Sequence, residues 1–295
     1  MMKFAIVIPA KNEEAIIKST LSSIADQTLL PVVCLVVDDG SSDATSDIVK
    51  AFSGTYPFIE YLYNDNQNEY ILGGHIVQVF GIGKSHIDRN EIPYDYIVKL
   101  DADVSFEKDF LQKMSDRLEK EQYGIISGTP YYLEDDKKIF EFSPLWHTHG
   151  QFKIYNKQCL DDIQGLAPSL GWDCADNVKA IDKGWKTAAF RDVFYQMHRK
   201  VGGKSSLKKG RINHGIGAYK LGYSLPYFLL RVVHDLFKPP IITGSFYLLY
   251  GYTKSLLSRN TGHILNKRQI KLMRKLFWKS FTQRLSAKEF ILFQR

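Results

Sequence analysis

The sequence predicts an α/β fold, in which a mostly parallel sheet is flanked by helices and followed by a helical, basic C-terminal extension. The continuous apolar run at 4–10 and the largely apolar segments at 32–39 and 94–100 are typical of strands in the interior of a sheet. Segments with helical spacing separate these runs, so strands and helices alternate through residue 100. With 44% hydrophobic residues, the 295-residue chain can bury a full core.

The first half of the chain alternates regularly. FAIVIPA (4–10) is the first strand, and the segment AIIKSTLSSIADQ (15–27) that follows it has apolar residues near helical spacing. Pro31 ends that segment, and VVCLVVDD (32–39) is the second strand, with a helix after the turn GSSDAT. The next elements keep the alternation: a strand at 58–64, a helix at 73–87 and a strand at 94–100.

The second half is less regular but still mixes strands and helices. FLQKMSDRLEKE (110–121) predicts an amphipathic helix, and YGIISGTPYYLE (123–134) predicts a strand. QFKIYNKQCLDDIQGL (151–166) begins as a strand and becomes a helix. GWDCADNVKAIDKGWK (171–186) predicts a helix that starts near Trp172, and the short strand TAAFRD follows it.

The three cysteines indicate a reducing, cytoplasmic compartment. Cys34, Cys159 and Cys174 are widely spaced and form no CxxC motif, which argues against a disulfide framework or a cysteine zinc site. The first residues predict a strand and a polar turn, so we expect no signal peptide. The longest uncharged stretch, 239–253, has 15 residues, which is shorter than the roughly 20 that a spanning helix needs.

Charge is distributed unevenly along the chain. Residues 1–195 hold 19 Lys+Arg and 30 Asp+Glu, a net of −11, whereas residues 196–295 hold 20 Lys+Arg and only Asp235 and Glu289, a net of +18. A basic final third on an acidic body predicts an anionic partner, such as lipid headgroups, a phosphorylated acceptor or nucleic acid. No nucleic-acid recognition motif is present, so we expect no nucleic-acid partner.

Polar and acidic residues follow three of the predicted strands, in PAKNEE, DDGSSD and DADVSF. Ligands of open parallel sheets bind at the carboxyl ends of the strands, so these residues can line one crevice. Such a crevice attracts a diphosphate when a hard divalent cation sits on its carboxylates. Asp101 and Asp103 are two residues apart and share one face of an extended strand, so one can hold the metal while the other holds a ribose hydroxyl or a metal-bound water.

The segments VIPAKNEEAIIKSTLSSIADQT, VVDDGSSDAT and KLDADVSF together resemble a family-two glycosyltransferase with the GT-A fold, over roughly residues 3–195. The resemblance implies that DAD is the DxD motif and that Mn²⁺ or Mg²⁺ binds Asp103, with His198 of the basic segment MHRKVGG beside it. It also implies a pocket for a nucleotide-diphosphate sugar that is lined by Pro9, Ala10, Asn12, Glu13, Asp38, Asp39, Lys99 and Asp101.

The resemblance also implies an inverting transfer in which a carboxylate removes the proton of the acceptor. Members of the family often carry Glu-Asp at the start of the helix on the acceptor side, whereas this chain has GWDCAD. Trp172 replaces the usual acid and Asp173 matches the position of the base, with Asp176 as the alternative. There is no Walker sequence and no GxGxxG after the first strand, which argues against a P-loop nucleotidase or a dinucleotide dehydrogenase.

We therefore expect a glycosyltransferase domain at 1–197 and a basic, aromatic-rich extension at 198–295. The expected reaction transfers a sugar to a hydroxyl of a cell-envelope glycan or lipid-linked acceptor; the alternatives are a nucleotidyltransferase and an inactive glycan- or membrane-binding module. LPYFLLRVVHDLF (225–237) and IKLMRKLFWKSF (270–281) predict amphipathic helices. They would hold the enzyme peripherally on the anionic inner face of the cell membrane, unless their apolar faces complete the core.

Overall fold

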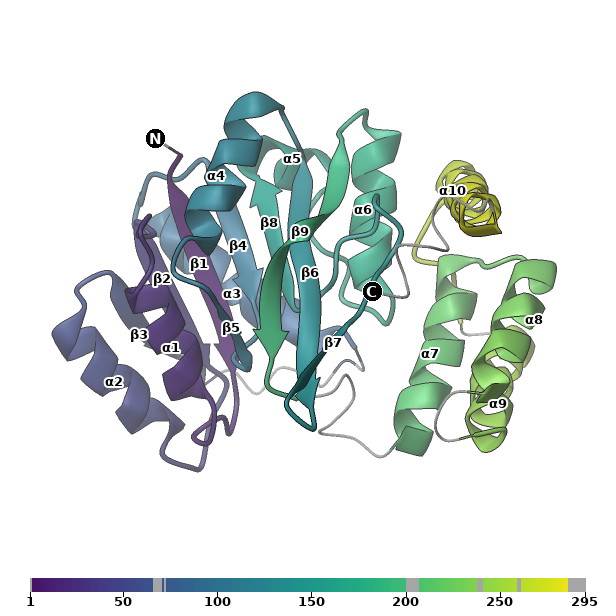
Figure 1. Ribbon diagram of the computed structural model, residues 1–295, viewed down its shortest axis with the longest axis horizontal. Coiled ribbons are helices and arrows are strands. Elements are labelled where there is room, and N and C mark those ends of the chain that lie inside the picture. Colours follow the sequence, from purple (N-terminus) through teal and green to yellow (C-terminus); the bar gives the residue numbers. More distant parts are fainter. Residues whose placement is uncertain are drawn as a thin grey trace.

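The computed structural model describes residues 2–65, 71, 73–199, 207–237, 241–258 and 261–285 of the chain. In this part of the chain, a nine-stranded sheet is covered by helices on both faces, and four further helices pack beside it (Figure 1). The predicted α/β fold is therefore confirmed. The strands are β1 (Phe4–Ala10), β2 (Val33–Asp38), β3 (Ile59–Tyr63), β4 (Tyr96–Leu100), β5 (Val104–Phe106), β6 (Ile125–Glu134), β7 (Lys137–Phe140), β8 (Phe152–Asn156) and β9 (Thr187–Met197).

The first half of the sheet is parallel, as the sequence predicts. β1 pairs in parallel with β2 and β4, and β2 pairs in parallel with β3. In this register Ala10 lies opposite Asp38, and Asp38 lies opposite Tyr63. The carboxyl ends of these strands therefore meet at one edge of the sheet, which is where open α/β sheets bind ligands.

The second half of the sheet is mixed, and the strand order is β3-β2-β1-β4-β8-β6-β9-β5, with β7 beside β6. β8 runs antiparallel to both β4 and β6, whereas β6 and β9 are parallel. β9 continues to Met197, well past the short strand that the sequence indicated. Its first residues pair with β6 and its last residues pair with β5, so this one strand links the middle of the sheet to the turn that carries DAD.

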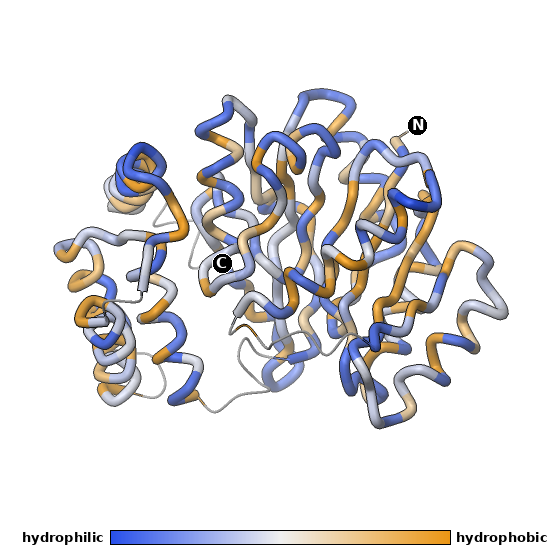
Figure 2. The backbone as a smooth tube through the Cα atoms, turned by 180° about the vertical axis from the view of Figure 1, so that it is seen from behind, coloured by the Kyte–Doolittle hydropathy of each residue, from blue (hydrophilic) through white to orange (hydrophobic). Residues whose placement is uncertain are grey.

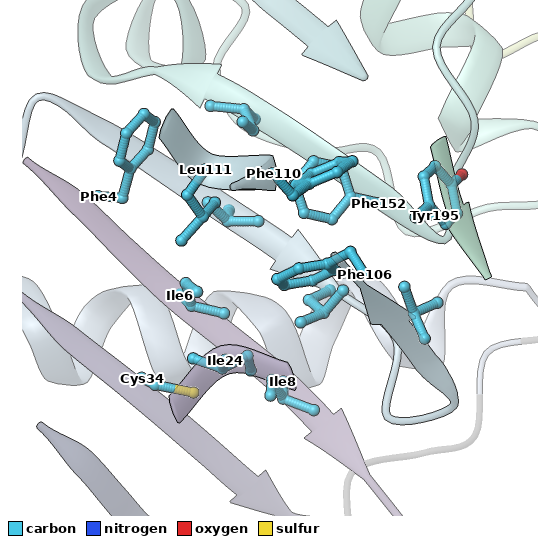
Figure 3. Packing of buried hydrophobic residues seen from close by; sticks show 14 of the residues in the cluster. Phe4, Ile6, Ile8, Ile24, Cys34, Phe106, Phe110, Leu111, Phe152 and Tyr195 are labelled. Carbon is cyan, nitrogen blue, oxygen red and sulfur yellow. The ribbon is translucent and has the colours of Figure 1, made fainter. Parts of the chain in front are cut away.

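Two apolar layers hold the helices against the sheet. One face is covered by α1 (Ile17–Ala25), α2 (Thr45–Thr55) and α4 (Phe110–Lys120), and the other by α3 (His75–Arg89) and α5 (Lys157–Asp162). In the first layer, the ring of Phe110 packs against those of Phe106 and Phe152, at 4.8 and 4.9 Å between ring centroids (Figure 3). Hydrophobic residues are frequent along the strands of the sheet between these two layers of helices (Figure 2).

The final third of the chain forms a group of helices that we call the helical lobe: α7 (Leu207–Leu221), α8 (Leu225–His234), α9 (Thr243–Leu257) and α10 (Lys267–Leu285). Its apolar core includes residues of α6 (Trp172–Asp182), so α6 joins the lobe to the sheet (Figure 1). α7 and α9 cross through two glycines, because a Cβ on Gly215 would lie 2.1 Å from the Leu248 carbonyl oxygen and one on Gly251 would lie 2.1 Å from that of Ile212.

The two amphipathic segments that the sequence singles out have different environments. In α10, Met273 and Phe277 are buried in the core of the lobe. In α8, Phe228 is buried, but Leu229 and Val233 are exposed. No helix among the described residues has the length and apolar character that crossing a membrane requires.

Candidate functional site

The loops after β1 and β2 are tied to each other at the carboxyl edge of the sheet. Asn12 has a φ of 54°, in the left-handed region that asparagine tolerates, and its Oδ1 accepts a hydrogen bond from the Ser42 N–H at 2.8 Å. The Asn12 N–H donates to Ser41 Oγ at 3.0 Å, and the Glu13 N–H donates to Thr45 Oγ1 at 2.7 Å. PAKNEE and DDGSSD therefore form one wall, in which Asn12 links the two loops.

The two aspartates at the end of β2 are both hydrogen-bonded inside this wall. Asp38 accepts a hydrogen bond from the hydroxyl of Tyr61 at 2.9 Å, and burial together with this contact raises the pKa of Tyr61 to about 12. Asp39 accepts one from the amide of Asn64 at 2.8 Å and lies 2.5 Å from Nε2 of His75. No motif in the sequence marks Asn64, which follows β3, or His75, which begins α3, and both are far along the chain from Asp39.

The DAD segment is a turn between β4 and β5. The chain leaves β4 at Leu100, so the argument that Asp101 and Asp103 share a strand face is wrong. They nevertheless lie close enough for the charge of Asp101 to raise the pKa of Asp103. Lys99, which is 1% exposed, lies beneath the turn, where its Nζ pairs with the Asp101 carboxylate and donates to the Gly150 carbonyl oxygen at 2.7 Å.

Asp103 lies in an electrostatic environment that favours a bound cation. Burial, followed by the charges of Asp101 and Glu13, raises the pKa of Asp103 to about 6. Arg199 and Lys99 oppose this shift: Arg199 pairs with the Glu13 carboxylate and has Nη1 3.9 Å from Asp103 Oδ2. Clustered carboxylate oxygens are ligands that Mn²⁺ and Mg²⁺ accept, so Asp103 with its neighbours fits such an ion.

His198 reaches Asp103 through the backbone. Its N–H donates to the Asp103 carbonyl oxygen at 2.9 Å, while Nε2 of its ring lies 2.8 Å from Ser105 Oγ. Burial lowers the pKa of His198, which keeps the ring neutral and able to bind a metal. Within the described ranges no three His, Cys, Asp or Glu side chains are arranged to hold a metal ion by themselves. Lys200, from the same basic segment, lies outside the described residues.

Asp173 and Asp176 lie one turn apart on α6 and have opposite environments. Both oxygens of Asp176 lie 2.7 Å from Lys153 Nζ, and one also accepts from the Tyr155 hydroxyl at 2.6 Å. Burial raises the pKa of Asp176, and the Lys153 and Tyr155 contacts act against that shift. The Asp173 carboxylate, in contrast, makes no hydrogen bond or ion pair with another described residue, and it is partly exposed.

Gly150 brings Asp173 next to the DAD turn. Its carbonyl oxygen accepts from Lys99, while a Cβ added to it would lie 3.2 Å from the Asp173 Cβ. The charge of Asp173 also reaches two histidines of the loop before Gly150. Burial lowers the pKa of His147 to about 4 and that of His149 to about 3, and Asp173 opposes both shifts. The sequence assigns no role to these two histidines, because the His-Thr-His segment has no recognisable partners with which to bind a metal.

A cluster of carboxylates at the strand ends of an α/β sheet, with a partly exposed aspartate at a nearby helix start, is an arrangement found in transferases that use nucleotide donors. The sequence profile of glycosyl transferase family 2 matches residues 5–172, more than half of the chain. The chain therefore belongs to glycosyl transferase family 2, as its three motifs indicate, and carries the glycosyltransferase domain of that family.

Curated relatives match over about half of this chain. Glycosyltransferase GlyA of Streptococcus pneumoniae serotype 4 is 26% identical over 154 residues, which is 52% of this chain and 20% of the relative. The 4,4'-diaponeurosporenoate glycosyltransferase of Staphylococcus aureus strain COL is 29% identical over 160 residues, which is 53% of this chain and 39% of the relative. The matched part thus spans well under half of the length of these relatives.

Solved structures confirm the GT-A fold. Residues 1–349 of TarS from S. aureus align with 97% of this chain at a TM-score of 0.53 and 16% identity, covering 83% of that chain. A mannosyltransferase from Pyrobaculum calidifontis, solved with GDP-Man and Mn²⁺, aligns with 97% of this chain at a TM-score of 0.55 and 18% identity, covering 88% of that chain. At these identities the likeness establishes the fold alone.

Proposed function

We propose that this protein transfers a sugar from a nucleotide-diphosphate sugar to a hydroxyl of a cell-envelope glycan or lipid-linked acceptor, with inversion at the anomeric carbon. One observation carries the proposal: within a family 2 domain, Gly150 contacts Lys99 of the strand that leads into DAD and also lies next to the partly exposed side chain of Asp173. TarS has been solved with UDP and with UDP-GlcNAc, and the mannosyltransferase with GDP-Man, which supports a nucleotide-sugar donor. The nucleotidyltransferase alternative lacks a comparable observation.

Asp103 is the proposed holder of a divalent cation, with His198 beside it, and Asp101 is proposed to bind the nucleotide sugar. The environment of Asp103 supports this assignment, because burial and then the charges of Asp101 and Glu13 raise its pKa, and a bound cation would stabilise its ionised form. When bound, Mn²⁺ or Mg²⁺ supplies positive charge that stabilises the departing diphosphate. Lys99 contributes by fixing the Asp101 carboxylate, since its own ammonium is buried and already bonded to Gly150.

Asp173 is the proposed general base. The acceptor oxygen forms a bond to the anomeric carbon while the bond from that carbon to the diphosphate oxygen breaks. The proton of the acceptor hydroxyl passes to an Asp173 carboxylate oxygen. Asp176 is unsuited to this step, because Lys153 and Tyr155 occupy its oxygens.

The nucleotide is proposed to lie along the wall formed by the first two loops. The loop after β1 supplies one side of this wall, with Pro9, Ala10, Asn12 and Glu13. The end of β2 supplies the other side, with Asp38 and Asp39, which lie nearer the proposed position of the nucleobase. Residues 1–197 are proposed as the glycosyltransferase domain and residues 198–295 as an extension that holds it on the inner face of the cell membrane.

A donor screen tests this function. Full-length protein is incubated with a panel of nucleotide sugars and with Mn²⁺ or Mg²⁺, and release of nucleoside diphosphate is measured. We expect release from one donor class, its loss in excess chelator and its loss in Asp103→Ala. Asp192→Ala, which changes an exposed carboxylate of β9 that pairs with Arg117, is the matched control and should retain activity.

Full release in excess chelator or in Asp103→Ala would remove the DAD assignment. If nucleotide sugars stay intact under all conditions while a nucleoside triphosphate and a sugar phosphate are joined, the nucleotidyltransferase alternative takes its place.

A further inference from the structure

Exposed apolar side chains are concentrated on one part of the helical lobe. Nineteen large apolar side chains are exposed in the described residues, and ten of them lie between Leu225 and Leu257. Both α8 and α9 contribute, and α7 lies between them and the sheet (Figure 1). We call this area the α8–α9 surface and define it by Leu225, Leu229, Val233, Phe246, Tyr250 and Leu257.

The apolar residues of α8 form a regular outer stripe. Leu225, Leu229 and Val233 are spaced at i, i+4 and i+8, so they lie on one side of the helix, and their exposed fractions are 54%, 45% and 56%. Phe228, on the other side, is fully buried. In α9, Phe246, Tyr250 and Leu257 are exposed in the same way, while Leu248 is buried.

The core of the lobe is complete without these residues. Phe228 of α8 stacks on Tyr252 of α9 with 4.0 Å between ring centroids. Gly215 and Gly251 bring α7 and α9 into backbone contact, which leaves no gap for a further side chain. The exposed stripe is therefore additional to the core, and it differs in this respect from the apolar face of α10, which is buried.

The lobe presents cations around this surface and no exposed carboxylate among its described residues. Asp235 is the one acid between residues 207 and 285, and it is 5% exposed, because Arg211 binds it at 2.9 Å. Lys254 of α9 is exposed, and so are Lys208 and Lys209 of the adjacent helix α7, where Lys208 Nζ lies 5.2 Å from the centre of the Tyr247 ring of α9. A large apolar area with a basic margin matches the chemistry of an anionic lipid bilayer.

We propose that the α8–α9 surface docks on an anionic lipid bilayer, with Leu229 and Phe246 entering its apolar layer, while α10 stays in the core of the lobe. A second copy of the chain is a poor occupant, because two regions that each carry a net charge of +18 would repel. This inference deepens the membrane attachment in the proposed function by naming the helices that make contact.

The position of the lobe explains what docking would accomplish. α7 packs against the start of α6, since a Cβ on Gly171 would lie 3.0 Å from the Leu221 side chain. Asp173 therefore lies on the element that adjoins the lobe. An acceptor held by a membrane lipid would approach from the side of the proposed base, and the nucleotide wall would remain on the far side of the crevice.

Vesicle flotation of the full-length protein tests the docking. We expect binding to vesicles of phosphatidylglycerol and phosphatidylcholine that weakens as salt is added, and little binding to phosphatidylcholine alone. The double variant Leu229→Gln/Phe246→Gln should partition at least about tenfold less, because apolar burial of one large side chain contributes roughly that factor. Leu30→Gln/Leu133→Gln, on equally exposed side chains of the sheet domain, is the matched control and should bind like the unchanged protein.

A second measurement reports insertion directly. Tryptophan placed by Phe246→Trp should gain fluorescence quenching from bromine-labelled lipid chains, whereas Tyr63→Trp, on the exposed edge of β3, should not. No binding to the anionic vesicles at low salt, or equal binding by Leu229→Gln/Phe246→Gln, would overturn the proposal. So would a stable dimer in lipid-free solution that the same double variant dissociates.

Release of nucleoside diphosphate, measured in the same samples without lipid, separates this inference from the proposed function. Release without vesicle binding would remove the docking alone, and vesicle binding without release from any donor would remove the transfer alone.

Discussion

The carboxylates at the strand ends and the buried carboxylate between β8 and α6 differ in the charged groups that surround them. In the interior, Asp176 is buried, and the contacts with Lys153 and Tyr155 act against the rise in its pKa that burial causes. At the strand ends, burial and then the charges of Asp101 and Glu13 raise the pKa of Asp103 to about 6, and Arg199 and Lys99 oppose that shift. We therefore expect the interior pair to support the fold and the Asp103 cluster to be the one that a bound cation neutralises.

The largest expected effect comes from replacing Asp173, whose carboxylate makes no hydrogen bond or ion pair with another described residue. Asp173→Asn keeps the shape of the side chain but removes the proton acceptor, so kcat should fall by about 10² to 10⁴. Nucleotide affinity and the melting temperature should stay close to those of the unchanged protein. Steady-state kinetics and a thermal melt measure both. An unchanged kcat in this variant would contradict the role of Asp173 as general base.

The next largest effect concerns the buried ion pair of Lys153 and Asp176. Lys153→Met leaves Asp176 buried without its cation, and breaking such a pair costs about 3 to 5 kcal/mol of unfolding free energy. Urea unfolding measures the loss. Lys186→Met is the control, because Lys186 and its partner Glu121 are both exposed, and that pair should contribute less than about 1 kcal/mol. Equal losses in the two variants would contradict the assigned role of the interior pair.

The smallest expected effect is an increase in the free energy of unfolding rather than a decrease. The pKa of Asp103 lies about two units above its ordinary value of 3.8, so its ionised form destabilises the folded state. Asp103→Asn should therefore stabilise the ligand-free protein by about 1 to 3 kcal/mol at pH 8, since each unit is worth about 1.4 kcal/mol. The gain should shrink as the pH falls from about 6 and vanish below about 4, where both proteins are neutral at this position.

Melting curves at pH 8 and pH 4 check this prediction. A variant that is less stable than the unchanged protein at pH 8 would mean that Asp103 is balanced in the same way as Asp176.

Sequence patterns predicted the elements that depend on local or strand-end chemistry. The buried strands are continuous apolar runs, and the loops with PAKNEE, DDGSSD and DAD follow from where those runs stop. The patterns could not separate Asp173 from Asp176, because residues three apart on a helix lie on neighbouring parts of its surface. Lys153, from a strand twenty residues earlier than Asp173, makes the distinction, and only the folded chain brings it there.

Prediction of the basic final third from sequence was limited by the same dependence on tertiary contacts. Helical spacing in 225–237 and 270–281 predicted two similar amphipathic helices. Which apolar face of a helix is buried depends on the elements that pack against it. Met273 and Phe277 are buried in the core of the lobe, whereas Leu229 is exposed. Asn64 and His75 were missed for a related reason, since each contacts Asp39 from a distant segment.

The pairing of β5 with β9 also sets the order in which the site is completed during synthesis. The turn that carries Asp103 finds its strand partner in residues up to Met197, and the His198 N–H then bonds to the Asp103 carbonyl oxygen. Chains emerge from the ribosome N-terminus first, so the first strands can fold while this turn still awaits its partner. A nascent chain can therefore form the proposed nucleotide wall before the proposed metal site, and we expect it to bind a complete donor only late in translation.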